Sequence, residues 1–488
     1  MTFRTGVRPD IAVLADDLTS AGDGAAPFRR AGHEARILFG VPEAPPERAT
    51  GVTAVDLGSR MRDEEAAAAR TERAARLFAG VGLLLKTVDS TLRGHVAAEV
   101  RAAWAGSRRR AVVVAPAFPA EGRVTVEGVQ SVHGVPVHAS DFARDPVHPV
   151  RCSDLTELFP EAVPAGPDEA AGLPGLVDDG RLVVWSARTD GDLDRLVAAV
   201  PRLADVLWVG SPGLAAALAR RCVREEDGAP GVPEPALRPL VVVGSAHPVS
   251  RRQLAVLRRR ADVRAAVVDG DRGAAERAVA ALRGSPAPVL ALHTPDERHA
   301  PSAAGVLAGS VAAAVRALAG GRAVDALVLT GGETASTAFR ALGATGIRLA
   351  DEPEPGVARG TLLGPLPLPV LVKAGGFGDD AALLRLSQLA RQPLGSPLLP
   401  RHRRSHGRPP DRPRESPPDR PSVGRRERPL GLPHDRPLVR PLDDRPFDNR
   451  PFDDRPFNDR PFNGRLFDDR LFNDRLFDDR PLDPGACA

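Results

Sequence analysis

Residues 86–95 concentrate the side-chain types that bind a small polar ligand. The stretch KTVDSTLRGH follows the apolar run VGLLL and supplies two cations and three short hydrogen-bonding groups: Lys86, Arg93, Asp89, Ser90 and Thr91. Ser and Thr are also typical helix caps, so Ser90 or Thr91 is expected to cap the alanine-rich segment 94–104. A cap does not explain a lysine at the end of an apolar strand. A site for a polyhydroxy acid does, because cations can bind its carboxylate and the short groups its hydroxyls.

Asp16 and Asp17 form a second polar cluster, directly after the apolar run IAVLA at 11–15. Thr19 and Ser20 can cap the helix that follows, and so can an aspartate. Capping requires only one carboxylate, and adjacent side chains on an extended backbone point in different directions. We therefore expect one aspartate to face a cleft, where it can hold sugar hydroxyls or accept the proton of a substrate hydroxyl. Capping alone is the competing interpretation.

Two arginines could complete this cleft. Arg60 lies in DLGSRMRDEEA, between an apolar stretch and a predicted helix, and could bind a carboxylate through two N–H groups. A surface arginine near a helix start is the alternative. Arg123 lies in PAFPAEGRVTVEGVQ, where a rigid turn precedes an alternating, hairpin-like run, and it could face the same cleft.

Three glycine-bearing turns follow apolar runs in the second half of the chain. The stretches VVVGSAHPVS, LVLTGGETAS and VLVKAGGFGDD place these candidate phosphate-binding residues there: Ser245, Gly331, Gly332, Glu333, Thr334, Gly375 and Gly376. Such turns expose backbone N–H groups and aim a helix N-terminus at an anion, typically a phosphate. None matches a Walker loop or the dinucleotide fingerprint G-x-G-x-x-G, and each is weak alone. Together they predict a nucleotide site, and with a hydroxy-acid site they predict phosphoryl transfer to a hydroxyl.

Short runs rich in Val, Leu and Ile alternate with helix-like stretches along most of the chain. The predicted buried strands are 11–15, 82–86, 111–116, 182–185 and 240–245, with further ones starting at 326 and 369. This alternation favours mostly parallel sheets with helices on both faces. We predict an α/β protein with two α/β domains, residues 8–230 and 238–395, separated by the Pro/Gly-rich stretch 228–239.

The composition changes abruptly after residue 395. Segment 396–488 is dominated by Pro, Arg and Asp, and from about 445 it repeats units such as RPFDD and RLFDD. Proline at this frequency excludes regular helices and central strands, so we predict a disordered tail. Self-association through its Phe and Arg side chains is an alternative role, and a dispensable extension is the simpler one.

Whole-chain composition limits the partners and the compartment. The net charge is +3, and the arginine runs at 108–110 and 258–260 are typical of solvated helix ends, so we expect no nucleic-acid partner. No apolar run approaches the roughly 20 residues of a membrane helix, and the first residues turn acidic too early for a signal peptide. The three cysteines, Cys152, Cys222 and Cys487, form no disulfide or zinc pattern. These features predict a cytoplasmic enzyme without a membrane partner.

In order and spacing, these motifs resemble the four-carbon acid sugar kinases. The matching stretches are LADDLTSAGD, SRMRDEEA, KTVDSTLRGH, PAFPAEGRVTVEGVQ, VVGSAHPVSRRQ, LTGGETAS and VKAGGFGDDAALL, which span residues from about 10 to 392. The resemblance implies an N-terminal sugar-binding domain, a C-terminal nucleotide-binding domain, and transfer of the ATP γ-phosphate to a hydroxyl of a C4 acid such as threonate, erythronate or 3-oxo-tetronate. ATP with Mg²⁺ is the implied cofactor. A homodimer is one alternative for the oligomeric state.

The resemblance also assigns residues. Asp16, Asp17, Arg60 and the run Asp89-Ser90-Thr91 fall on substrate positions, and Ser245, 331–334 and Gly376 fall on ATP positions. Two departures stand out: Ser20 replaces a glycine of the first motif, and His247 replaces the second serine of the GSxS turn. The first change could alter the sugar preference, and the second could alter nucleotide contacts.

These residue assignments predict a mechanism, and two other functions compete with it. Arg60 and Lys86 hold the substrate carboxylate, Ser90 and Thr91 contact its hydroxyls, and Asp17 or Asp89 takes the proton of the attacking hydroxyl. No protein metal site is predicted. One rival is a non-catalytic sensor that binds a sugar acid and a nucleotide. The other is a dehydrogenase, which the absence of the dinucleotide fingerprint disfavours.

Overall fold

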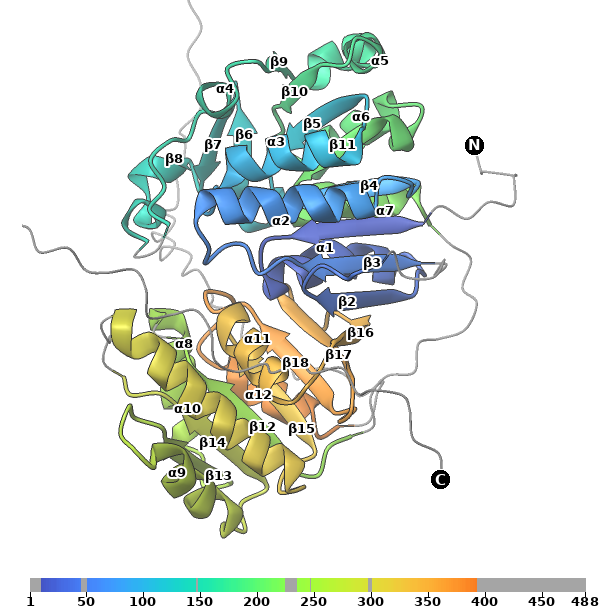
Figure 1. Cartoon of the computed structure of the whole chain (residues 1–488). Coiled ribbons are helices and arrows are strands. Elements are labelled where there is room, and N and C mark those ends of the chain that lie inside the picture. The colour runs from blue at the N-terminus through green and yellow to red at the C-terminus, as the bar shows by residue number, and fades with distance from the viewer. Residues whose placement is uncertain are drawn as a thin grey trace, which may run out of the picture. The chain divides into compact units, whose positions relative to one another are not determined.

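The computed structural model describes residues 10–44, 51–145, 148–223, 235–245, 247–296 and 301–392 (Figure 1). The predicted tail, 396–488, and most of the predicted linker lie outside these ranges. The described part contains one 15-stranded sheet and one small three-stranded sheet. The architecture is mixed α/β, as expected.

In the N-terminal half, eight parallel strands run in the spatial order β2-β3-β1-β4-β11-β5-β10-β9. Their bounds are β1 (Ile11–Ala15), β2 (Ala35–Phe39), β3 (Val52–Asp56), β4 (Leu83–Thr87), β5 (Ala111–Ala115), β9 (Val163–Ala165), β10 (Leu182–Trp185) and β11 (Val206–Gly210). Every residue of β1, β3, β4, β5 and β11 is buried. This explains why these strands are nearly continuous apolar runs rather than alternating ones.

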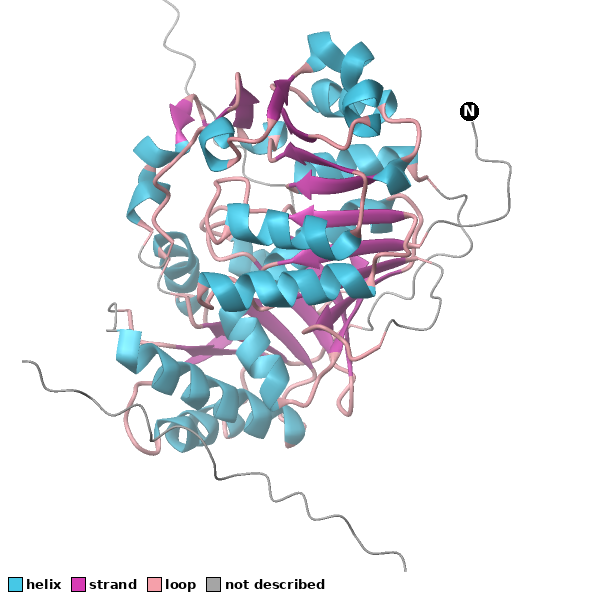
Figure 2. Cartoon of the chain, turned by 45° about the horizontal axis from the view of Figure 1, so that its top comes forward, coloured by secondary structure: helices cyan, strands magenta, loops and turns pink. Residues whose placement is uncertain are grey.

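Helices cover both faces of this half, as Figure 2 shows. One face packs against α2 (Glu64–Leu77) and α3 (Val96–Ser107), and the other against α1 (Leu18–Arg30), α5 (Leu173–Asp178), α6 (Asp190–Ala199) and α7 (Pro212–Arg221). The small antiparallel sheet, β6 (Arg123–Val126), β7 (Val129–Val132) and β8 (Val135–Pro136), follows β5, and α4 (Leu155–Leu158) follows it. The expected hairpin after residue 122 is therefore confirmed.

The C-terminal half repeats the strand–helix alternation. Its parallel strands lie in the order β13-β14-β12-β15-β18, and the sheet continues with antiparallel β17 and β16. The bounds are β12 (Pro239–Val243), β13 (Val263–Val267), β14 (Val289–His293), β15 (Ala326–Thr330), β16 (Gly346–Asp351), β17 (Val357–Leu363) and β18 (Pro369–Lys373). On one face lie α8 (Pro248–Arg258) and α12 (Ala382–Leu389), and on the other α9 (Ala274–Arg283), α10 (Pro301–Gly320) and α11 (Gly332–Ala341).

Strand β16 joins the two halves, because it pairs with β2 in an antiparallel register. The Phe39 ring on β2 stacks on the Phe339 ring on α11, with centroids 5.4 Å apart. Arg29 on α1 donates from Nε to the carbonyl of Ala350 at 3.0 Å. The two halves therefore share one continuous sheet and one large hydrophobic cluster, a connection that the prediction of two α/β domains did not include.

The predicted strand positions are confirmed to within two residues, but two local predictions, on the cap of α3 and on Arg109, are wrong. Helix α3 begins after His95, which makes no side-chain cap, so neither Ser90 nor Thr91 caps it. Of the caps considered for α1, the aspartate is confirmed: Asp17 caps the helix, and Thr19 and Ser20 do not. Arg109 is not solvated: it is 8% exposed, and its guanidinium donates to the carbonyl of Val81 at 2.6 Å.

Candidate active site

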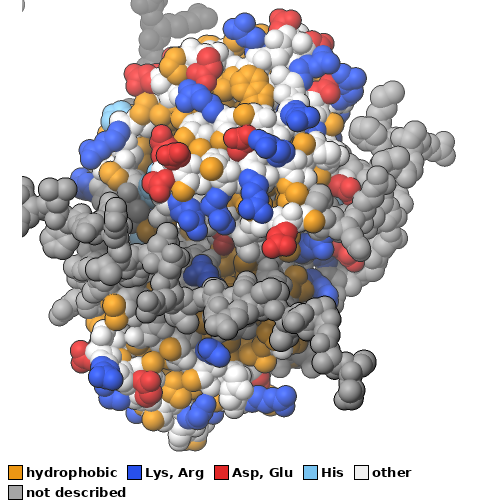
Figure 3. Space-filling model, viewed as in Figure 1, with side chains coloured by type: hydrophobic (Ala, Val, Ile, Leu, Met, Phe, Trp, Pro, Cys, Tyr) orange, Lys and Arg blue, Asp and Glu red, His pale blue; other side chains and the backbone are white. Residues whose placement is uncertain are grey.

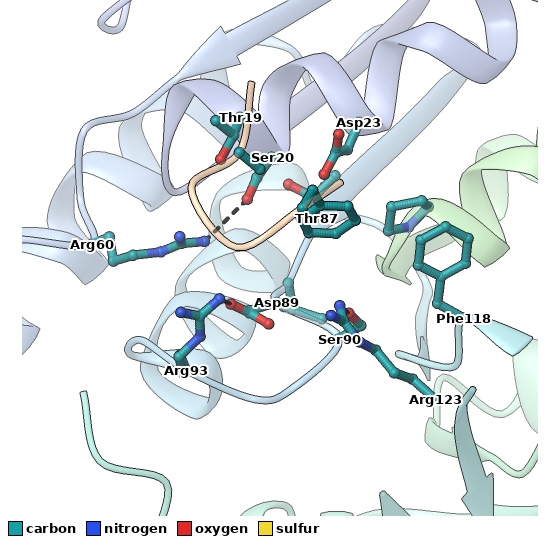
Figure 4. A pocket seen from close by; sticks show the side chains of 15 residues that line it. Thr19, Ser20, Asp23, Arg60, Thr87, Asp89, Ser90, Arg93, Phe118 and Arg123 are labelled. Carbon is teal, nitrogen blue, oxygen red and sulfur yellow. Dashed lines mark hydrogen bonds and ion pairs between the residues drawn. The ribbon is translucent and has the colours of Figure 1, made fainter. Parts of the chain in front are cut away.

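A pocket opens at the carboxyl ends of β1 and β4, where a parallel sheet of this kind binds its ligands. Polar side chains from four segments of the N-terminal half line it: Thr19, Ser20, Asp23, Arg60, Thr87, Asp89, Ser90, Arg93 and Arg123 (Figure 4). Ala374 and Phe377, from the turn after β18, line it too. The pocket is therefore built jointly by the two halves of the chain.

Arg60 is held by the aspartate pair that follows β1. Its Nε and Nη2 donate to the two carboxylate oxygens of Asp16 at 2.7 and 2.9 Å, and Nη1 pairs with Asp17 Oδ2. A further Nη2 hydrogen bond reaches Ser20 Oγ at 3.0 Å. Four of the five guanidinium N–H bonds are thus used inside the protein, which leaves one for a ligand.

Asp16 and Asp17 both pair with Arg60, and Asp17 also caps helix α1. Asp17 Oδ1 accepts from the backbone N–H of Ser20 at 2.7 Å and so caps α1. Asp16 is buried, which alone would raise its pKa, but the charges of Arg60 and Lys86 outweigh burial and lower it. Asp16 is therefore an ionised anchor for Arg60 and does not carry a proton at neutral pH.

Asp89 organises the turn after β4. Its Oδ1 accepts from the backbone N–H and the hydroxyl of Thr91 at 2.8 and 2.6 Å, and its Oδ2 pairs with Arg93 at 2.5 Å. Burial opposes ionisation, but Arg93, Arg60 and the Thr91 hydrogen bond together lower the pKa of Asp89. Thr91 is fully buried and serves the turn, whereas Ser90 and Arg93 line the pocket.

Lys86 does not line the pocket. It is fully buried, and its ammonium pairs with Glu99 Oε2 on α3 at 2.8 Å and donates to the carbonyl of Thr87 at 2.8 Å. The expectation that Lys86 grips the substrate carboxylate does not agree with this placement. Its positive charge instead acts beneath the pocket, on Asp16.

Arg123 has more free N–H bonds than the other pocket arginines. The only hydrogen bond of its guanidinium within the described residues runs from Nη1 to Ser90 Oγ at 2.5 Å, and no carboxylate pairs with it there. Sequence reasoning placed Arg123 at the cleft but left it out of the substrate contacts. The signal was the glycine before it: Gly122 adopts φ +65° and turns the chain from β5 into β6, which carries Arg123 over the pocket.

The three glycine-bearing turns of the C-terminal half meet one another, because β12, β15 and β18 are adjacent parallel strands. A Cβ placed on Gly375 would lie 3.1 Å from Ser245 Oγ, and one on Gly331 would lie 3.6 Å from Ser245 Cβ. Gly331 has φ +96°, which favours glycine, and α11 begins directly after it. The turns thus form one glycine-lined surface.

The turn after β18 has its carbonyls pointing inward. Lys373 Nζ donates to the carbonyls of Ala374 and Phe377 at 2.7 and 2.9 Å, and Ser250 Oγ donates to that of Gly375 at 2.8 Å. In a trans peptide the N–H points away from its carbonyl, so the next N–H groups, of Gly375, Gly376 and Gly378, point outward. Successive outward N–H groups form a concave anion site of the type that binds phosphate.

The sequence contains only two lysines, and both are fully buried at the end of a strand. Lys86 is the second-last residue of β4, beneath the acid pocket, and Lys373 is the last residue of β18, beneath the glycine turn. Burial lowers the pKa of Lys373 to about 8, against the opposing charge of Glu354. Both ammonium groups donate to backbone carbonyls at or just after the strand end, so the two lysines position the site from below.

The helix α11 N-terminus connects the two regions. A Cβ on Gly332 would lie 3.5 Å from Asp17 Oδ2, so the first turn of α11 borders the aspartate pair. Thr334 packs against Gly244, and Glu333 is exposed in the first turn. An anion bound at this N-terminus would lie beside the acid pocket, which brings a donor phosphate and an acceptor hydroxyl together.

No group of three or more His, Cys, Asp or Glu in the described ranges is arranged to hold a metal ion. Mg²⁺ in nucleotide enzymes needs only one or two carboxylates and takes its other ligands from phosphates and water. Glu333, in the first turn of α11, and Asp17, which borders that turn, fit that limited requirement. Both described cysteines, Cys152 and Cys222, are free.

On the face shown in Figure 3, acidic and basic side chains are interspersed over the N-terminal elements. This mixed distribution differs from the concentrated basic surface that nucleic-acid binding needs. Among the helices described, none has the length and hydrophobicity to span a membrane.

Comparison with known families assigns both halves. Residues 11–218 match the model of a sugar-binding N-terminal domain, and residues 240–383 match that of a nucleotide-binding C-terminal domain. A D-threonate kinase of Bordetella bronchiseptica is 39% identical over 79% of this chain and 98% of its own length. A D-threonate kinase of Cupriavidus necator is 35% identical over 76% and 95%, and a 3-oxo-tetronate kinase of Methylobacterium radiotolerans 32% over 75% and 96%.

Two crystal structures share the fold. A protein from Salmonella typhimurium, described as a putative tRNA synthase, superposes with a TM-score of 0.66 at 23% identity over 78% of this chain and 99% of its own. A Haemophilus influenzae protein gives 0.61 at 20% identity over 78% and 98%. The fold, the two matched domains and the curated relatives agree: the chain belongs to the four-carbon acid sugar kinase family.

Proposed function

We propose that this protein transfers the γ-phosphoryl group of ATP to a hydroxyl of a four-carbon sugar acid, and that D-threonate is the acceptor. The observation that carries the proposal is the shared pocket: residues from the glycine turn after β18 line the same cavity as Arg60, Asp89 and Arg123. A phosphate donor on that turn would face an acid bound by the N-terminal half. The curated relatives that are 39% and 35% identical to this chain are D-threonate kinases.

Arg123 is the group best placed to bind the acid's carboxylate, because it has N–H bonds to spare and no carboxylate partner in the described chain. Ser90 orients this arginine, and Arg93 lies on the same wall of the pocket. Arg60 offers its one remaining N–H bond, with Asp16 and Asp17 holding it in place. The predicted role of Arg60 as the main carboxylate clamp is thereby reduced to a supporting contact.

The glycine turns bind the phosphates through outward N–H groups and the N-terminus of α11. When bound, Mg²⁺ would neutralise phosphate charge and take Asp17 or Glu333 as protein ligands. Since little covalent chemistry is required of the protein, correct placement of the hydroxyl against the γ-phosphate supplies most of the catalysis. The pocket walls from both halves also exclude water, which limits hydrolysis of ATP.

ADP release with D-threonate, D-erythronate and a 3-oxo-tetronate, each with and without Mg²⁺, tests the proposal. We expect acceptor-dependent and Mg²⁺-dependent ADP release, fastest with D-threonate, and a phosphate ester of the acid detected by mass spectrometry. Tight binding of acid and nucleotide without turnover would instead favour the sensor. Light scattering after size exclusion tests in the same preparation whether the protein is a homodimer.

A further inference from the structure

The two aspartates that sequence reasoning offers as the base are already engaged. Asp17 uses Oδ1 to cap α1 and Oδ2 to pair with Arg60. Asp89 uses Oδ1 for Thr91 and Oδ2 for Arg93, and these contacts favour its ionised form. A carboxylate stabilised in this way is a weak proton acceptor, because its basicity falls with its pKa. The site therefore requires another acceptor for the hydroxyl proton.

Asp23 is a third carboxyl in the pocket, and its oxygens are unused. It lies one turn into α1, is half-buried and lines the cavity together with Thr87 and Phe118. In Figure 4 its carboxyl group points into the pocket, on the side of Thr87. Its carboxyl group has no hydrogen bond or ion pair within the described part of the chain. It neither caps a helix nor anchors an arginine, so no structural role accounts for a carboxyl at this position.

The backbone around Asp23 is tightly held. A Cβ on Gly24 would lie 2.7 Å from side-chain atoms of both Val13 and Thr87, and one on Gly22 would lie 3.0 Å from Ala358 Cβ on β17. Helix α1 is thus fixed between the N-terminal sheet and the joining strands of the C-terminal half. Because α1 cannot rotate in this space, the Asp23 side chain stays directed into the pocket.

The surroundings of Asp23 favour proton uptake. Burial first, and then the negative charges of Glu352 and Asp17, raise its pKa well above the ordinary value. Arg123 opposes this shift and Asp89 adds to it. These groups reach Asp23 from the segment after β16, from the start of α1, from β6 and from the turn after β4. A carboxylate with a raised pKa is a better acceptor for a hydroxyl proton than an ordinary one.

We propose that Asp23 is the catalytic base, a role that rests on the proposed kinase function. The acceptor hydroxyl oxygen forms a bond to the γ-phosphorus of ATP as the bond from that phosphorus to the β,γ-bridging oxygen breaks. ADP leaves with that electron pair, and the hydroxyl proton passes to a carboxylate oxygen of Asp23. Product release returns the proton to water.

The test compares Asp23→Asn with Asp178→Asn, a matched change at an exposed surface carboxylate. We expect Asp23→Asn to lower kcat about 100-fold, within the range for loss of a general base, with the KM for ATP changed less than about twofold. The fall of kcat/KM toward acidic pH should become shallower by one proton in this variant. Asp178→Asn should match the wild type in rate and pH profile.

Folding of the variant is checked by its Tm. Because Asn removes a carboxyl that burial disfavours, the Tm of Asp23→Asn should equal or exceed that of the wild type. If it is lower, Asp23→Glu gives a second reading: it retains the carboxyl, so it should be more active than Asp23→Asn. Equal activity of these two variants would overturn the role.

The outcomes separate the two proposals. An active wild type whose Asp23→Asn variant keeps kcat within about threefold and an unchanged acid limb overturns the base assignment alone. A wild type without acceptor-dependent ADP release overturns the proposed function, and the role of Asp23 falls with it.

Discussion

The guanidinium carbon of Arg123 lies 5.5 Å from the centre of the Phe377 ring, within the range of a cation–π contact. Arg123 begins β6 in the sugar-binding half, and Phe377 belongs to the glycine turn of the nucleotide-binding half. The same arginine reaches Ser90 at 2.5 Å. One side chain thus contacts both the acid pocket and the turn expected to bind phosphate. Binding of a ligand at either site should therefore change the affinity of the other site for its ligand.

Replacing Arg123 should weaken binding of the acid more than binding of ATP. A charge-assisted hydrogen bond contributes about 1.5–3 kcal/mol, so Arg123→Met should raise the KM for D-threonate by about 10- to 100-fold. Steady-state kinetics with each substrate varied in turn measures the effect. Arg101→Met is the matched control, because Arg101 also lies over a ring, that of Phe159, but on an exposed surface. An equal rise in both KM values would contradict this assignment.

A negative charge added at the N-terminus of α11 should weaken binding of ATP. Gly332→Asp would place a carboxylate beside Asp17 and in the space assigned to phosphate, because a Cβ there already lies 3.5 Å from Asp17 Oδ2. We expect ATP affinity to fall at least about tenfold, the usual scale of one lost or repelled charge contact. Calorimetric titration with a non-hydrolysable ATP analogue measures it. Gly309→Asp, in open space on α10, is the control and should bind the analogue as the wild type does. Unchanged affinity of Gly332→Asp for the analogue would show that the phosphates bind elsewhere.

Much of this arrangement could be predicted because parallel strands bring their carboxyl ends to one edge. The apolar runs located β1, β4, β12, β15 and β18, and their order along the chain then implied that the polar residues after them would meet. The joining strands β16 and β17 were missed, since both mix polar and apolar residues and Arg348 and Arg359 interrupt their apolar pattern. Local pattern does not reveal an antiparallel edge that pairs with a distant strand.

Charge partners were the least predictable feature. Lys86 looked like a ligand because its sequence neighbours are polar, but its partner, Glu99, lies on the next helix. Glu99 sits among Val96, Val100 and Ala103, the residues with which α3 packs on the sheet. A carboxylate on the buried face of a helix signals a buried cation nearby, and it could have shown that Lys86 is already paired.

Breaking the Lys86–Glu99 pair should destabilise the fold. The side chains are 0% and 3% exposed, so removal of one partner leaves a buried charge without its counter-ion. Glu99→Gln or Lys86→Met should each lower the free energy of unfolding by about 3–5 kcal/mol, and the double variant Lys86→Met/Glu99→Leu should recover most of the loss. Urea unfolding followed by circular dichroism measures all three. Additive losses in the double variant would show that the two groups do not act as a pair.

Asp56 should make stability depend on pH in a direction unusual for an aspartate. It ends β3, where its Oδ1 accepts from the Gly58 N–H at 2.9 Å and its Oδ2 from the Ser336 hydroxyl of α11 at 3.2 Å. Burial, followed by the charge of Asp17, raises its pKa to about 7. The folded protein therefore holds this proton more tightly than the unfolded chain does, and the stability that it confers falls as the pH rises from about 4 to about 7.

The variant Asp56→Asn removes this titration, so comparing its stability with that of the wild type measures the contribution of Asp56. Between pH about 4.5 and about 7.5, the variant should gain stability relative to the wild type, up to a few kcal/mol for a shift of this size. Urea unfolding at several pH values gives the difference directly. Asp194→Asn, at an exposed carboxylate paired with Arg220, should follow the wild-type slope. If Asp56→Asn followed that slope as well, Asp56 would titrate alike in the folded and unfolded chains, and burial would not raise its pKa.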